Sequence, residues 1–190
     1  MTKEFITDKT FKNKNYTEKN LAKGEYENCT FSNSIFSNTN LSGLSFTECE
    51  FENCDLSMAK LKDTAFRSVK FIKCKLLGLH FDDCNDFIIL LDFEDCILNF
   101  SSFYSLKLKN ITFKNCKLEE VEFIETNLSN SIFDNCDLNR AIFENTILEK
   151  SDFRTSFNFS IDPEANRIKK AKFSMHGLSG LLDKYNLIIE

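Results

Sequence analysis

Apolar and polar residues repeat with a period of five along most of the chain. Phe or Leu occupies every fifth position from Phe93 to Phe153, and Tyr, Phe or Leu does so from Tyr26 to Phe81. The two series are offset by two residues. The residue two places before each of these centres is mostly small or β-branched, and the other three positions favour Asp, Glu, Asn, Lys and Ser. A period of five fits neither a helix nor a strand, so we expect a turn after each pentad, with two residues of each pentad pointing inward.

Stretches such as CDLNRAIFEN and TNLSNSIFDN resemble the A(D/N)LXX consensus of the pentapeptide repeat family. This resemblance implies an all-β solenoid, a right-handed quadrilateral β-helix in which four pentads make one square coil. It covers residues 21–160, which are enough for about seven coils of four pentads each. Neighbouring coils should stack ~4.8 Å apart, the spacing of neighbouring β-strands. The resemblance is far more specific for the fold than for a function.

The eight cysteines support this geometry because all of them fall on the small inward position. Cys54 and Cys74 are 20 residues apart, and Cys74 and Cys96 are 22 apart, which matches the offset between the two series. Thiols stacked in one column cannot surround a zinc ion, and apolar burial raises a thiol pKa and hides the thiol from substrates. We therefore expect free cysteines that act as small apolar residues, with no metal and no cofactor.

Candidate catalytic groups are few. His80 is in an outward position and His176 is near the C-terminus, and neither accompanies a recognisable set of catalytic partners. Phosphate-binding glycine loops and zinc-protease motifs are absent from the sequence. A β-helix filled by its own side chains also has no interior pocket for a substrate. The sequence therefore predicts a protein that is not an enzyme.

The two ends of the chain depart from the repeat. Lys9, Lys14 and Lys19 stand where the small inward residue belongs, and a dry core does not accept an unpaired ammonium group. Residues 1–20 are therefore predicted to be an N-terminal capping segment. At the other end, Asp162, Pro163 and Glu164 form a helix-start signal, which predicts a short helix through Lys170.

Residues 161–190 are predicted to form a helical C-terminal cap. It shields the last coil, mediates a two-fold dimer contact, or does both. The residues expected to cap or dimerise are Phe173, Leu178, Leu181, Leu182 and Tyr185.

A two-residue register break lies between residues 82 and 92. A bulge here can lift Asp86, Phe87 and Ile88 away from the wall as a projecting contact point. Alternatively, the apolar residues of this segment refill the core around a kink. The sequence leaves both possibilities open.

The net charge is −5 and the sequence pI is about 5.2, which argues against direct binding to nucleic acid or to an anionic membrane. Neither a membrane-spanning run nor a signal peptide is recognisable, so we expect a cytoplasmic protein. Stacking the pentads by the repeat gathers carboxylates on one wall and its neighbouring side, and a different wall carries Arg67, Lys107, Lys109 and Lys150. The candidate partner-binding carboxylates are Asp63, Asp82, Asp83, Glu119, Glu120, Glu122, Glu125 and Glu144.

The repeats and the C-terminal segment together look like the branch of the family that contains the quinolone-resistance Qnr proteins and mycobacterial MfpA. That resemblance implies a homodimeric, DNA-mimicking rod that binds a type II topoisomerase, DNA gyrase or topoisomerase IV, and protects it from quinolones. The chain lacks the long inserted loops of the Qnr proteins. The alternative function is a general protein-interaction scaffold with a different partner.

Overall fold

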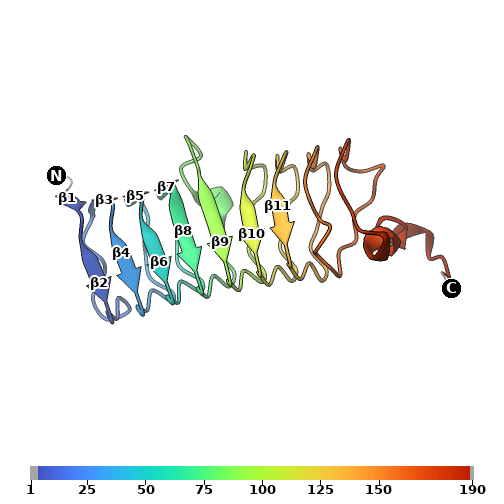
Figure 1. Cartoon of the computed structure of the whole chain (residues 1–190). Coiled ribbons are helices and arrows are strands. Elements are labelled where there is room, and N and C mark those ends of the chain that lie inside the picture. Colours follow the sequence, from blue (N-terminus) through green and yellow to red (C-terminus); the bar gives the residue numbers. More distant parts are fainter. Residues whose placement is uncertain (1–3, 189–190) are drawn as a thin grey trace.

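The computed structural model describes residues 4–188, which form a β-solenoid whose coils stack along one axis (Figure 1). Strand pairs are parallel, and in all but one pair the partner residues lie 20 positions apart, as Phe31 and Phe51 do. This is the spacing of four pentads per coil, so the predicted fold is confirmed. A four-stranded sheet contains β1 (Glu4–Thr7), β3 (Gly24–Glu27), β5 (Ser45–Thr47) and β7 (Ala65–Arg67). A seven-stranded sheet contains β2 (Thr10–Lys12), β4 (Thr30–Ser32), β6 (Glu50–Glu52), β8 (Val69–Ile72), β9 (Leu91–Glu94), β10 (Thr112–Lys114) and β11 (Ile132–Asp134).

The exceptional pair is β8 and β9, which contains the register break. Phe71 of β8 faces Phe93 of β9, a separation of 22 residues that restores the alignment of all later coils. A short 3-10 helix, η1 (Phe81–Asp83), begins the inserted segment. The break therefore changes one coil and leaves the stack continuous.

The interior consists of stacked aromatic rings. Along the seven-stranded wall, neighbouring rings such as Phe93 and Phe113 lie parallel, with centroids 5.2 Å apart. Rings on opposite walls meet edge to face, as Phe103 and Phe113 do at 5.9 Å. Both arrangements are favourable aromatic geometries. They explain the 21 Phe of the sequence, because most of these rings fill the same interior stacks.

Most corners of the solenoid are made by one residue with a positive φ, two places after the pentad centre. Asn28 (φ 49°) and Asn115 (φ 53°) are typical, and Asn and Asp tolerate this conformation better than most residues do. Among residues 4–188, glycine stands at such a corner at two places, Gly43 and Gly78. The turns therefore need few glycines and no proline, which accounts for the scarcity of both residues.

The small inward residues also hold neighbouring coils together. Their side chains donate hydrogen bonds to backbone carbonyls of the preceding coil, for example Thr64 Oγ1 to Leu41 O (2.9 Å) and Cys74 Sγ to Phe51 O (3.2 Å). Ser151 and Thr146 do the same farther along the chain. Cys, Ser and Thr are preferred at this position because each supplies a side-chain donor that bonds a carbonyl of the coil on its N-terminal side.

The N-terminal residues belong to the stack, unlike the separate capping segment expected over residues 1–20. β1 pairs with β3 and β2 pairs with β4, so residues 4–20 form the first coil. Lys9, Lys14 and Lys19 are exposed. Their position is inward in later coils, but in the first coil it faces the open end. This explains how lysines are accepted there.

The C-terminal residues also differ from the expectation. The segment from Asp162 to Lys170 is not helical and instead continues the coil. Arg167 bridges to Ile147 and Lys172 bridges to Asp152, so coil stacking extends past residue 160. The helical cap starts later, as the 3-10 helices η2 (Met175–Leu181) and η3 (Asp183–Tyr185).

Candidate protein-binding surface

The acidic wall is the side of the solenoid whose pentads centre on Leu61, Phe81, Phe103, Phe123 and Phe143. Single parallel bridges hold its coils in register, among them His80 to Ser102, Ser102 to Glu122 and Glu122 to Ile142. The ladder fixes which outward side chains become neighbours. The predicted stacking of this wall is therefore the one observed.

The structure brings the predicted carboxylates together along this wall. Asp63 N donates to Asp83 O at 2.9 Å, which places these two acidic residues at one corner in successive coils. Glu125 N donates to Glu144 O at 2.8 Å two coils farther on, and Glu122 lies in the same pentad as Glu125. Asp82 also faces outward on this wall, whereas Glu119 and Glu120 occupy the adjoining side, as the sequence predicted.

Several of these carboxylates have partners inside the protein. Glu120 pairs with Arg140 at 3.1 Å, and Asp82 lies 3.5 Å from His80. Glu119 accepts hydrogen bonds from Asn99 and Asn139 of the neighbouring coils. Tyr104 donates to Glu125, and this carboxylate raises the pKa of Tyr104. Of the predicted carboxylates, those without an ion pair or side-chain hydrogen bond to the described residues are Asp63, Asp83, Asp86, Glu122 and Glu144.

A surface hollow lies along the edge of the acidic wall and contains residues that the sequence analysis did not select. Phe100 and Ile142 form its apolar part, and Glu120, Glu122 and Arg140 form its charged part. Phe100, Glu120 and Arg140 are 20 residues apart and occupy one corner of successive coils. The 20-residue period of the sequence could have revealed this column if the residues at the corner position had been aligned as well as those on the walls.

The register break resolves into a projecting part and a buried part. Phe87, Ile88 and Leu90 are 71%, 55% and 50% exposed, whereas Ile89 is 6% exposed and joins the core. Ile88 has φ 61°, a conformation that is unfavourable for a β-branched residue. Leu90 N donates to Phe66 O at 3.2 Å, so the structure shows an apolar tip on the side of β7, one corner away from the acidic wall, in the green segment that leads into β9 (Figure 1).

The basic wall is the side that contains the four-stranded sheet and, in later coils, the pentads centred on Leu108, Leu128 and Leu148. Lys107, Lys109 and Lys150 are exposed on it, and Arg67 is partly buried and donates to Ser45 Oγ at 2.9 Å. Because the coil continues past residue 160, this wall also gains Arg167, which pairs with Glu149 at 2.7 Å. Glu25 and Glu27 of β3 also lie on this side, so its basic character is confined to the coils from β7 onward.

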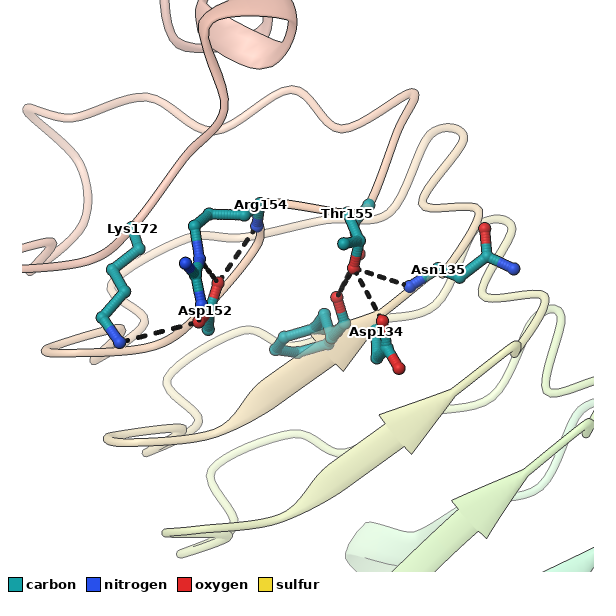
Figure 2. A network of polar contacts seen from close by, with 8 residues as sticks. Asp134, Asn135, Asp152, Arg154, Thr155 and Lys172 are labelled. Atoms are coloured by element: carbon teal, nitrogen blue, oxygen red, sulfur yellow. Dashed lines mark hydrogen bonds and ion pairs between the residues drawn. The ribbon is translucent and has the colours of Figure 1, made fainter.

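On the seven-stranded wall, acidic groups near the C-terminus are already paired (Figure 2). Asp152 receives the Arg154 guanidinium at 2.7 Å and the Lys172 ammonium at 3.6 Å. The Arg154 hydrogen bond lowers the pKa of Asp152. Asp134 accepts a hydrogen bond from Thr155 at 2.9 Å. The C-terminal part of this wall therefore offers few free carboxylates to a partner, whereas Glu50, Glu52 and Asp92 lie nearer its N-terminal end.

Two descriptions of repeat families match the chain. "Pentapeptide repeats (8 copies)" matches residues 27–63 and 49–85, and "Pentapeptide repeat region" matches residues 91–157. Together these matches span most of the chain and coincide with the coils of the structure. The chain is a pentapeptide repeat protein.

Solved structures similar to this pentapeptide repeat protein include two of QnrB1, described as a plasmid-mediated fluoroquinolone resistance protein. A trypsin-treated variant has a TM-score of 0.64 with 16% sequence identity, and it covers 98% of this chain and 100% of that chain. Full-length QnrB1 has a TM-score of 0.56 with 16% identity, covering 97% and 100%. No curated protein matches the chain in sequence. At this identity the likeness shows a shared fold.

The cysteines of this repeat protein are all buried and free. Cys54, Cys74, Cys96, Cys116 and Cys136 form one column, and each donates to a carbonyl of the preceding coil. In the neighbouring column, burial raises the pKa of Cys49 to about 11. Among residues 4–188 there is no group of three or more His, Cys, Asp or Glu side chains that could hold a metal ion. These thiols are structural donors rather than the purely apolar fillers expected from the sequence.

The predicted cap residues fall into two groups. Phe173 stacks on Phe153 with centroids 5.4 Å apart, and Leu181 packs against the core, so both cover the last coil. Leu178, Leu182 and Tyr185 are 40%, 37% and 52% exposed. These three side chains are exposed, and the Tyr185 hydroxyl donates to Glu164 Oε1 at 3.2 Å.

Close packing fixes the C-terminal cap on the last coil. A Cβ atom added at Gly180 would lie 2.2 Å from Phe159 O, so only glycine allows this approach. Lys184 reaches Asp162 at 2.7 Å and Glu164 at 2.6 Å.

No helix in the described part of the chain is long and apolar enough to cross a membrane.

Proposed function

We propose that this pentapeptide repeat protein is a non-enzymatic binding protein whose acidic wall occupies the DNA-binding surface of a type II topoisomerase, DNA gyrase or topoisomerase IV. The supporting observation is the row of unpaired carboxylates along one wall: Asp63, Asp83, Glu122 and Glu144. A basic surface that binds DNA phosphates attracts such a row by charge complementarity. The protein thereby acts as a DNA-mimicking rod and touches no nucleic acid itself.

The charge spacing makes this mimicry partial. Duplex DNA carries one charge per ~1.7 Å of its axis, which is about three charges over the ~4.8 Å rise of one coil. The acidic wall supplies fewer carboxylates per coil, and Lys60 and Lys62 stand among them. Binding therefore depends on the few unpaired carboxylates, and neutralising them should have a large effect.

The apolar tip, one corner away from the acidic wall, is the second contact in this proposal. Phe87 and Ile88 project from the break, and Asp86 next to them is exposed and unpaired. Exposed aromatic and aliphatic side chains at the centre of an interface commonly contribute much of the binding energy. The tip thus adds an apolar anchor to a surface that otherwise relies on charge.

The proposed assembly is a cytoplasmic homodimer joined through the exposed residues of the C-terminal cap. Leu178, Leu182 and Tyr185 can bury against the same residues of a second copy around a two-fold axis. The acidic walls of the two copies then form one longer rod. This doubles the length over which the topoisomerase can be engaged.

DNA supercoiling by purified gyrase tests the proposal. We expect micromolar protein to inhibit supercoiling, and lower amounts to reduce inhibition by a fluoroquinolone. The second effect is the protection from quinolones that the resemblance implies. Unchanged supercoiling at micromolar protein, with and without the drug, would contradict the proposal.

The second candidate is a scaffold for a different protein partner. The ion pair between Glu120 and Arg140 favours it, because this pair reduces the negative charge beside the acidic wall. A pull-down from the native cytosol separates the two candidates. Capture of a topoisomerase supports DNA mimicry, whereas capture of another protein without topoisomerase supports the scaffold.

A further inference from the structure

The N-terminal end of the solenoid is an open sheet edge. Within the described residues, β2 pairs with β4 and has no strand on its other side. Thr30 N donates to Lys9 O at 2.9 Å, and Asn13 N donates to Ser32 O at 3.0 Å. In a parallel ladder the residues between these contacts point their N–H and C=O groups the other way, so those of Thr10 and Lys12 face outward. Such an edge is a template for an added strand.

Three ammonium groups surround this open edge. In later coils the small inward side chains reach the preceding coil, as Thr64 Oγ1 reaches Leu41 O at 2.9 Å. Each coil has four such inward positions. In the first coil they are occupied by Glu4, Lys9, Lys14 and Lys19, all of which are exposed. The lysines make no ion pair within residues 4–188. Lys9 immediately precedes β2, and Lys14 is the second residue after it.

The two ends of the stack are finished differently. At the C-terminal end, Phe173 and Leu181 cover the last ring of the core. At the N-terminal end the first ring is only partly covered, because Ile6 and Phe11 are half-buried while their successors Tyr26 and Phe31 are buried. A solenoid end normally needs a polar cover for its core. The first coil therefore has apolar, hydrogen-bonding and charged groups available for a partner.

A second copy of the chain fits this end poorly. Joining two N-terminal ends would bring the lysines of both copies together, and like charges opposed across a strand pair are destabilising. An extended segment with carboxylates has the complementary charge. Its backbone can pair with Thr10 and Lys12 while its carboxylates meet the lysines.

We propose that the edge of β2 binds an acidic extended segment of a partner protein by strand addition, which adds an eighth strand to the seven-stranded sheet. This site lies at the end of the stack and is independent of the acidic wall. The lysines have two effects on it, since they attract the acidic segment and keep a second copy of the chain away.

The test uses the full chain and two short peptides, one of alternating threonine and glutamate and a matched one of threonine and lysine. We expect the acidic peptide alone to slow amide hydrogen exchange at Thr10 and Lys12. The triple variant Lys9→Ser, Lys14→Ser and Lys19→Ser should weaken binding by about tenfold, because three attractive charges are lost. A control variant with the same charge change, Lys60→Ser, Lys62→Ser and Lys73→Ser, should keep it.

Serine suits the three substituted positions because the second coil has small side chains there: Cys29, Ser34 and Thr39. The triple variant should therefore fold with an unchanged melting temperature. Several results would overturn the proposal. They are no binding of the acidic peptide, equal binding of the basic peptide, or equal weakening in both triple variants. Self-association of the Lys9, Lys14 and Lys19 variant without acidic-peptide binding to the parent chain would also overturn it, since the lysines would then serve only to exclude a second copy.

Discussion

Most corners of the solenoid depend on a residue that accepts a positive φ. Asn occupies many corners, but Lys150 (φ 60°) stands at one of them directly next to Asn130 (φ 59°) of the preceding coil. Residues other than Gly, Asn and Asp pay a steric cost in this conformation. The identity of the corner residue therefore matters to stability even though its side chain is exposed.

This cost predicts a reciprocal pair of stability changes. Lys150→Asn should raise the free energy of unfolding by about 0.5 kcal/mol, and Asn130→Lys should lower it by a similar amount. Both side chains lie on the same wall in neighbouring coils, so each variant is a control for the other. Chemical denaturation measures both values. Changes of the same sign in the two variants would contradict the explanation.

The buried thiols make the protein sensitive to alkaline pH. Burial raises the pKa of Cys49 from 9.0 to about 11. A folded-state pKa above the unfolded value means that the contribution of Cys49 to stability is complete below pH 9.0 and is lost as the pH rises toward about 11. We expect unfolding midpoints to fall across this range.

Cys49→Ser is the control for the alkaline effect, because Ser keeps a hydrogen-bond donor at this position and does not ionise in this range. The variant should lose less stability between pH 9.0 and about 11 than the parent does. An identical pH dependence in both proteins would show that Cys49 does not contribute.

The inward positions were predictable from the sequence because each lies at a fixed place in the pentad. Phe93 and Phe113 were placed in one column by spacing alone, and the rings do stack. The donor role of the cysteines was missed, since spacing shows that a residue points inward but not that its Sγ reaches a carbonyl. The matching use of Ser and Thr at the same position was the available signal.

Among the larger elements, the expected helix from Asp162 to Lys170 shows why a local signal can fail. The ladder with the preceding coil competes with the helix, and Arg167 N donates to Thr146 O at 3.0 Å. Asn166 completes the ladder by accepting from Thr146 N and donating to Phe143 O. The start signal at Asp162 is strong locally, but the longer-range hydrogen bonds prevail.

The C-terminal cap predicts a specific effect on assembly. Leu182 is exposed while Leu181 packs on the core, so Leu182→Asp should dissociate the proposed dimer without disturbing the coil. Light scattering should show about half the parent mass, with an unchanged circular dichroism spectrum. A dimeric Leu182→Asp variant, or a parent that is already monomeric, would rule out this contact.

For the whole molecule, the arrangement of the acidic wall was largely predictable, whereas its effective charge was not. The repeat placed Glu122 and Glu144 on one wall, and the structure places them there too. The pairing of Glu120 with Arg140 escaped prediction, because ion pairs between coils depend on side-chain conformations that spacing does not describe. The sequence did not decide whether the segment at the register break projects or is buried, because an apolar segment suits both arrangements.

Binding of purified gyrase to the full chain tests the central claim most directly. The acidic-wall variant Asp83→Asn, Glu122→Gln and Glu144→Gln should bind about tenfold more weakly than the parent, because it loses unpaired charges that face the partner. The control variant Glu27→Gln, Glu48→Gln and Glu52→Gln removes the same charge from the other walls and should bind like the parent. Equal affinities for all three proteins, or no binding by the parent, would contradict the claim that the acidic wall takes the place of DNA.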